Sequence, residues 1–125
     1  RLWGWIQDRF ESASTFNGRF FIANYCPLVF MEESGRNRTP DKLPAREYEP
    51  LFQACDEALR RLVEWCQPKH VIGVGKFAES RALAALENTR VPIGTILHPS
   101  PASPAANRGW QKQVEKQLYS QGIII

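Results

Sequence analysis

The chain has 125 residues, of which 43% are hydrophobic, and this length and apolar content suit one globular domain. Its formal net charge of +3 and sequence pI near 8.9 are compatible with a polyanionic partner, but such values are also common without one. No apolar run approaches the ~20 residues that cross a bilayer, so no membrane partner is expected.

The sequence begins at Arg1 without a methionine or a signal peptide, and we expect an intracellular fragment or processed piece. Its three cysteines form no Cys-x-x-Cys pair and no group with zinc spacing. This pattern predicts buried, reduced thiols. We expect neither a metal site nor a cofactor.

The first part of the chain predicts a short helix followed by a buried strand. Apolar residues recur at helical spacing over residues 2–10, and Ser12 to Gly18 is a turn-rich break. Phe20 to Phe30 is rich in aromatic and branched residues, which favours a buried strand ending in a polar turn. Asn24 lies at its centre and needs a hydrogen-bond partner there.

A loop and a long amphipathic helix follow. Glu32 to Pro44 is a loop by composition, and Arg36 and Arg38 make it cationic. From Leu51 to Cys66 the apolar residues share one helical face, and Pro68 ends this helix.

The rest of the chain alternates strands and helices. We expect a strand over Val71–Gly75, a helix over Lys76–Leu86, and a strand over Thr95–Leu97. A rigid loop over Pro99–Pro104 then leads to a helix over Ala105–Gln121, with a buried stripe at one face. Strands separated by helices predict an α/β domain with a parallel sheet, whose ligands bind beyond the carboxyl ends of the strands.

Three residues fall at or near those strand ends: Asn24, Gly75 and His98. A strand delivers His98 to the sheet rim and prolines stiffen the backbone after it, and a catalytic donor needs such rigid placement. A single histidine is nevertheless often structural, because its nitrogens readily bond a nearby backbone group. A strand asparagine such as Asn24 can likewise bond to neighbouring backbone.

Several segments carry a resemblance to a known family. The run from His98 to Trp110, His-Pro-Ser-Pro-Ala-Ser-Pro-Ala-Ala-Asn-Arg-Gly-Trp, resembles the motif after the last strand of the uracil-DNA glycosylase superfamily. Its second half is typical of the single-strand-selective branch. The segments Asn24–Leu28, Glu33–Asn37 and Gly73–Lys76 follow the family's order, so the resemblance covers essentially the entire chain.

The resemblance implies a fold and a domain. The fold is the family's three-layer α/β/α arrangement around a parallel sheet, and residues 1–125 would be the C-terminal part of that single domain. The family's first strand, which lies between two of the strands found here, is not in this sequence. Without it, backbone donors and acceptors need other partners.

The resemblance also implies an activity. Such enzymes are monofunctional uracil-DNA glycosylases: they flip uracil out of single- or double-stranded DNA and hydrolyse the N-glycosidic bond, which initiates base excision repair. Asn24 would read the uracil edge, and His98 would donate to uracil O2 as negative charge gathers on the base. Oxidised pyrimidines such as 5-hydroxymethyluracil are expected as further substrates. The resemblance also implies that the complete protein is nuclear and monomeric.

The family's wedge, which enters the duplex where the base has left, would be formed by Ser100 to Asn107. Ala102 and Ser103 depart from the vertebrate pattern, which has arginine and asparagine there. By resemblance, the DNA-contacting residues are Gly75, Lys76, Ser100, Pro101, Ala102, Ser103, Pro104, Asn107 and Arg108.

Each of these features has a plainer interpretation. The proline-rich run can be a helix start without a DNA role, and Gly73–Lys76 can be a tight strand-to-helix turn in place of a phosphate clamp. Arg36 and Arg38 can be solvated in place of facing the DNA backbone.

One family motif is not found in this sequence. It is a Gly-Met-Asn-Pro-Gly-Pro-type segment with the water-positioning asparagine, followed by an aromatic residue that stacks on the base. We therefore expect the chain to be inactive alone. The alternatives are a noncatalytic DNA-binding remnant, a close relative acting on mismatched uracil or thymine, and an unrelated α/β domain that binds a nucleotide through Gly73–Lys76.

Overall fold

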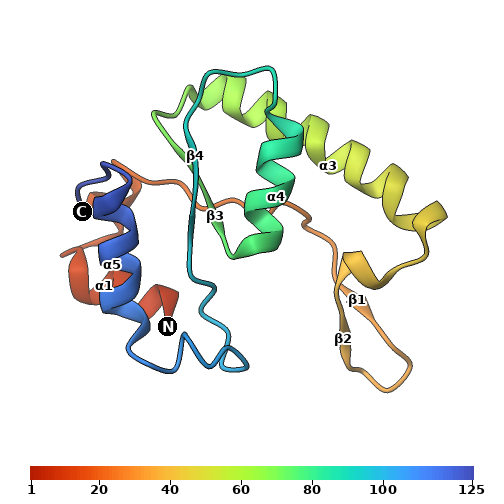
Figure 1. The fold of residues 1–125 in the computed structure, drawn as a ribbon, viewed down its shortest axis with the longest axis horizontal. Helices are drawn as coiled ribbons and strands as arrows, with labels where there is room; N and C mark the ends of the chain where they lie inside the picture. Colours follow the sequence, from red (N-terminus) through yellow and green to blue (C-terminus); the bar gives the residue numbers. More distant parts are fainter.

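The computed structural model describes the backbone of all 125 residues and the side chains of all but Asp41. In chain order the elements are α1 (Leu2–Arg9), α2 (Ala13–Asn17), β1 (Phe30–Met31), β2 (Asn37–Arg38), η1 (Pro40–Lys42), α3 (Ala45–Cys66), β3 (Val71–Val74), α4 (Lys76–Ala85), β4 (Ile93–Ile96) and α5 (Trp110–Ser120). Strands β3 and β4 pair in parallel, and β1 and β2 form an antiparallel hairpin. Helices α1 and α5 lie on one side of the parallel pair and α3 and α4 on the other (Figure 1). The predicted α/β class is confirmed.

An aromatic cluster joins α1, α2 and α5. Trp5 makes edge contacts with Phe10 and Trp110 at centroid distances of 6.0 and 6.1 Å, and Phe10 meets Phe16 at 5.1 Å. Such pairs contribute about 0.5–1.5 kcal/mol each beyond the burial of their area. The buried members of the cluster are Trp5, Ile6, Phe10, Phe16, Ile96, Ala106, Trp110, Val114 and Leu118. The predicted first helix and the buried stripe of the last helix are therefore confirmed.

The long amphipathic helix is also confirmed as α3, and it starts earlier than its apolar stripe indicates. It ends where Gln67 adopts a left-handed conformation with φ of 45°, and Pro68 follows. A left-handed residue followed by proline is a common way to stop a helix.

The predicted strand over Phe20–Phe30 is wrong. Only Phe30 belongs to a strand, and the residues before it, called the extended segment below, form neither helix nor strand and run across the molecule as an unpaired coil (Figure 1). Phe21 is 73% exposed and Val29 is 74% exposed. The sequence has the composition of a buried strand, but a strand forms only where a neighbour accepts its backbone hydrogen bonds, and no strand lies beside this segment.

Further boundaries differ from the prediction, and the strand expected over Thr95–Leu97 is β4, which begins at Ile93 and ends at Ile96. The last helix begins at Trp110 and not at Ala105, because the intervening residues form turns that end at Gly109 with φ of 85°. The predicted loop over Glu32–Pro44 contains most of the small β1–β2 hairpin.

Side chains of α5 close the outer edge of β4. Gln121 Oε1 accepts from the Thr95 N–H at 3.0 Å, and Gln121 Nε2 donates to the Thr95 carbonyl at 2.9 Å. Gln117 Oε1 accepts from the Leu97 N–H at 2.8 Å. These amide groups take the place that a further strand would occupy in the ladder.

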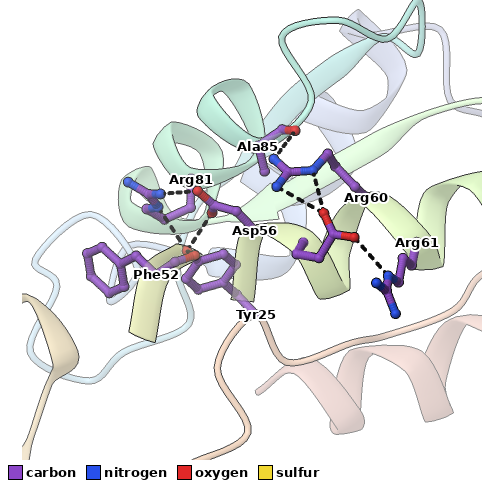
Figure 2. Close-up of polar contacts among 8 residues, drawn as sticks. Tyr25, Phe52, Asp56, Arg60, Arg61, Arg81 and Ala85 are labelled. Atoms are coloured by element: carbon purple, nitrogen blue, oxygen red, sulfur yellow. Dashed lines mark hydrogen bonds and ion pairs between the residues drawn. The ribbon is translucent and has the colours of Figure 1, made fainter. Parts of the chain in front are cut away.

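A polar network ties the extended segment to α3 and α4, as Figure 2 shows. The Tyr25 hydroxyl donates to Asp56 Oδ1 at 2.6 Å and accepts from Arg81 Nε at 3.0 Å. Arg81 Nη2 lies 2.5 Å from Asp56 Oδ2, and its guanidinium stacks 4.7 Å above the Phe52 ring. No strand lies beside the extended segment, and these side-chain contacts hold it in place at Tyr25.

Replacing Gln121 with alanine tests the closed edge. The Thr95 N–H and carbonyl would both lose their partner, and a partly buried backbone group left unpaired costs about 1–3 kcal/mol. We expect Gln121→Ala to lower the free energy of unfolding in urea by at least about 1 kcal/mol. Gln53→Ala, which truncates an exposed glutamine of α3, should stay within about 0.5 kcal/mol of wild type. An equal loss in both variants would argue against edge closure.

The Tyr25 network has a consequence at alkaline pH. Burial and the hydrogen bond to Asp56 raise the pKa of the Tyr25 hydroxyl above its ordinary value of 10. The stability from this raised pKa is fully present below pH 10 and is lost as the pH rises through the raised pKa. We expect the difference in tyrosinate absorbance between wild type and Tyr25→Phe to titrate above pH 10. A difference signal at or below this pH would contradict the network.

Candidate functional site

His98 follows β4 and lies at the surface, with one ring nitrogen already engaged. Its Nδ1 accepts a hydrogen bond from the backbone N–H of Ser100 at 3.1 Å. A neutral imidazole whose Nδ1 is an acceptor carries its proton on Nε2. The exposed ring therefore presents an Nε2–H donor, and the proline-flanked backbone fixes its direction.

The His98 ring rests on Gly75, the residue between β3 and α4. Gly75 has φ of 91°, and its N–H donates to the Ile96 carbonyl at 2.9 Å. A Cβ at this position would lie 3.0 Å from the Cβ and 3.2 Å from the Cδ2 of His98. Glycine alone combines this φ with the space that the ring needs. The tight strand-to-helix turn allowed by the sequence is therefore present.

Lys76, which begins α4 beside that turn, has a side chain that is 91% exposed. Its Nζ lies 3.2 Å from Glu79 Oε2. Such an exposed i,i+3 pair contributes little to stability, and the ammonium group can exchange this partner for another anion.

The segment between His98 and α5 is a loop of interlocked turns. Ser100 Oγ accepts from the Ala102 N–H at 3.2 Å, and the Ser100 carbonyl accepts from the Ser103 N–H at 3.1 Å. Asn107 Nδ2 donates to the Pro101 carbonyl at 3.0 Å. The Ser and Asn side chains thus stiffen the loop from within.

Cationic side chains gather beside this loop. Arg1 Nη1 donates to the Ser100 carbonyl at 3.3 Å, and Nη2 lies 2.5 Å from Asn107 Oδ1. Arg1, Arg108 and Lys112 line an open cavity of about 530 Å³ together with Trp110. The sequence did not point to Arg1 or Lys112, because their proximity depends on the packing of α1 against α5.

Asn24 is exposed and directly precedes the anchored Tyr25. Its side chain makes no hydrogen bond to any residue whose side chain is described, so the alternative of a bond to neighbouring backbone is not found. Asn24 lines a groove of about 810 Å³ that separates the extended segment from β3. Its carboxamide is therefore available to a ligand.

The structure brings some of the predicted site residues together. His98 and Gly75 are in contact, and Ser100 to Arg108 lie in the one loop that follows them. Asn24 lies on the groove that Gly73 also lines, and no hydrogen bond among the described residues joins it to His98. The site is thus divided between the rim at Gly75 and the groove beside β3.

The cysteines differ from one another. All three are free; Cys55 is buried, Cys26 is half-buried and Cys66 is exposed, so the prediction of buried thiols is wrong for Cys66. Burial and the neighbouring Cys26 raise the pKa of the Cys55 thiol to about 11.

Over the side chains that the structure describes, no three His, Cys, Asp or Glu groups gather as metal ligands. The described helices include none with the length and hydropathy to cross a membrane.

Comparisons with known proteins agree with the motifs. The family model "Uracil DNA glycosylase superfamily" matches residues 1–119. The single-strand selective monofunctional uracil-DNA glycosylase of Rattus norvegicus is 40% identical over 126 residues, which cover 99% of this chain and 45% of that protein. Proteins of the same name from Bos taurus and Mus musculus are also 40% identical, with 46% and 45% of their lengths covered.

The chain therefore spans a little less than half the length of these relatives, and the matched part is their C-terminal half. The family model extends over nearly all of the residues that form the fold and the candidate site. The chain belongs to the uracil DNA glycosylase superfamily.

Proposed function

We propose that this protein, acting together with the region that its relatives carry outside the matched part, removes uracil from DNA by hydrolysing the N-glycosidic bond. The names of the relatives and the family match support this activity. The observation that carries it is the Nε2–H of His98, whose direction is fixed by the Ser100 N–H on the opposite nitrogen. Removal of a damaged base in this way would begin base excision repair.

The chemistry requires stabilisation of charge on the departing base. As the C–N bond breaks, its electron pair moves onto uracil, negative charge gathers on O2, and the sugar becomes oxocarbenium-like. His98 would donate its Nε2–H to that oxygen while its Nδ1 stays bonded to the Ser100 N–H. One preorganised donor of this kind lowers a barrier by roughly 3 kcal/mol.

Asn24 would select the base. Its Oδ1 can accept from uracil N3–H and its Nδ2 can donate to uracil O4, whereas cytosine offers the opposite pattern at both positions. The free side chain of Asn24 and the fixation of its neighbour Tyr25 support this role. Uracil bases modified at C5, such as 5-hydroxymethyluracil, keep the same edge, and we propose them as further substrates.

The DNA partner, single- or double-stranded, would lie across the rim of the sheet. Ser100 to Pro104, with Asn107 and Arg108, form the stiff loop that would enter the space left by the flipped base. Gly75 and Lys76 would contact a phosphate, and Arg1 and Lys112 extend the cationic surface. Ala102 and Ser103 offer little phosphate contact, which favours single-stranded DNA, where flipping costs least. Nuclear localisation is part of the same proposal.

A second candidate function is DNA binding without catalysis. One observation favours it: the cationic side chains Arg1, Arg108 and Lys112 beside the loop suit phosphate binding whether or not catalysis follows. Activity of a fusion between the unmatched part of the Rattus norvegicus relative and this chain distinguishes the two functions. DNA binding by a folded fusion that releases no uracil would support the second.

In that fusion we expect His98→Ala to reduce the single-turnover rate of uracil release about 10²–10³-fold, as loss of one preorganised donor does. Binding of uracil-containing DNA should change little, because the proposed interaction strengthens as charge develops. His98→Gln, which retains an N–H donor, should keep more activity than His98→Ala. A wild-type rate in His98→Ala would rule out the proposed role.

Asn24→Asp should change base choice in the same fusion. A carboxylate cannot donate to uracil O4, and one unpaired polar group costs about 1–3 kcal/mol, so uracil release should fall about 5- to 160-fold. The ratio of uracil to cytosine release should fall with it. Asn17→Asp makes the same charge change at an exposed asparagine of α2 and should release uracil at the wild-type rate. An unaltered ratio in Asn24→Asp would exclude base recognition by this side chain.

A further inference from the structure

Phe77, the second residue of α4, is an exposed aromatic residue whose ring is held by two others. Its ring packs against that of Tyr25 at a centroid distance of 5.9 Å and against that of Phe52 at 5.8 Å. The interplanar angles are 78° and 58°, so both contacts leave the rings far from parallel. Phe77 nevertheless stays 40% exposed. Two aromatic neighbours thus fix the orientation of a ring that is partly open to solvent.

Phe77 lies between the two halves of the candidate site. The start of α4 is at the same end of the β3–β4 sheet as the loop after β4 (Figure 1). Phe77 comes two residues after Gly75, which the His98 ring contacts, and it touches Tyr25, whose neighbour Asn24 lines the groove. Single exposed apolar residues are common on protein surfaces. The significance of Phe77 therefore comes from its position at the rim, in contact with Tyr25.

A cationic side chain lies next to this ring. Lys76 precedes Phe77 in α4, and its side chain is 91% exposed. Its Nζ pairs with Glu79 Oε2 at 3.2 Å, and so exposed a pair can exchange its carboxylate for another anion. A flat apolar ring beside an ammonium group suits a polymer whose units each carry a flat ring and a negative charge.

Nucleic acid has this chemistry, and its single-stranded form fits the ring best. In a duplex each base is paired and already stacked on its neighbours, and taking it out of the stack costs a few kcal/mol. A base in a single strand can turn toward an aromatic side chain at much lower cost. Proteins that bind single strands combine cationic groups for the phosphates with aromatic side chains on which the bases stack.

We propose that Phe77 is a stacking site for an unpaired base of single-stranded DNA, with Lys76 bound to an adjacent phosphate. The inference rests on the proposed function for the choice of DNA as the partner. It adds a contact with a base other than the one that is released. This contact tolerates any sequence, because every base has a flat face.

The test measures binding of the fusion described above to two single-stranded oligonucleotides of equal length by fluorescence anisotropy. One is oligothymidine, and the other has the same sugar-phosphate chain without bases. Phe77→Leu keeps an apolar side chain against Tyr25 and Phe52 but has no flat ring. We expect it to weaken binding of oligothymidine about 5-fold or more and to leave binding of the base-free chain unchanged. Phe77→Trp restores a flat ring and should bind oligothymidine like wild type.

Two control variants separate stacking from other effects. Trp65→Leu makes an equivalent change at a residue of α3 that is 84% exposed, and it should bind both oligonucleotides like wild type. Lys76→Ala removes a phosphate contact and no base contact, so it should weaken binding of both oligonucleotides by the same factor.

A fluorescent base reports the stacking directly. When one thymine of the oligothymidine is replaced by 2-aminopurine, its emission falls as the base stacks on an aromatic ring. Saturating amounts of wild type and of Phe77→Trp should lower this emission. Saturating amounts of Phe77→Leu should lower it less.

Neither measurement requires release of uracil. Stacking by a fusion that releases no uracil would support this inference and count against the proposed function. Three results would overturn the inference even in a fusion that releases uracil. They are wild-type affinity of Phe77→Leu for oligothymidine, equal weakening of its binding to both oligonucleotides, and equal weakening of oligothymidine binding by Trp65→Leu.

Discussion

The hydrogen bond from the Gly75 N–H to the Ile96 carbonyl is the contact on which the candidate site depends. It is the last bond of the parallel β3–β4 pair, and it fixes the point where β3 ends and α4 begins. Gly75 has φ of 91° there, and the absence of a side chain leaves the space that His98 fills. A single turn thus determines where β3 ends, where α4 starts and where the imidazole lies. Moving any one of these would move the others.

Two kinds of interaction hold the chain on either side of that turn. On the α5 side, glutamine amides bind the edge of β4 and edge-to-face aromatic pairs fill the core. On the α3 side, an ion pair and a half-buried tyrosine hold the extended segment, with Arg81 shared between Tyr25 and Asp56. Removing one member of such a partly buried pair leaves the other uncompensated, so the anchor depends on all three groups. Side-chain contacts thus hold these segments in place, as hydrogen bonds between paired strands do in other sheets.

Much of the fold could be predicted from the sequence, and the failures have a common cause. Helices α3 and α5 were predictable because their apolar stripes are local patterns, and Pro68 and Gly75 mark boundaries through their own backbone preferences. The Phe20–Phe30 strand failed because pairing is not local: its composition suits a buried strand, but no strand lies beside it in this chain. The start of α5 was missed because turns within the Ser100–Asn107 loop replace helical bonds. His98 was found through its motif, whereas its bond from Ser100 and its contact with Gly75 required coordinates.

Because the site is divided between the rim at Gly75 and the groove beside β3, its two proposed roles depend on different parts of the fold. The position of His98 follows from β3, β4 and the loop after it, all of which are bonded within the chain. Asn24 is fixed on one side only, through Tyr25, while the backbone before it is unpaired. The residues before Tyr25 therefore keep more conformational freedom than the loop that holds His98, because ordering one residue's backbone costs about 1–2 kcal/mol and no ladder bond offsets that cost here. Base selection by Asn24 should therefore depend on the Tyr25 anchor more strongly than charge stabilisation by His98 does.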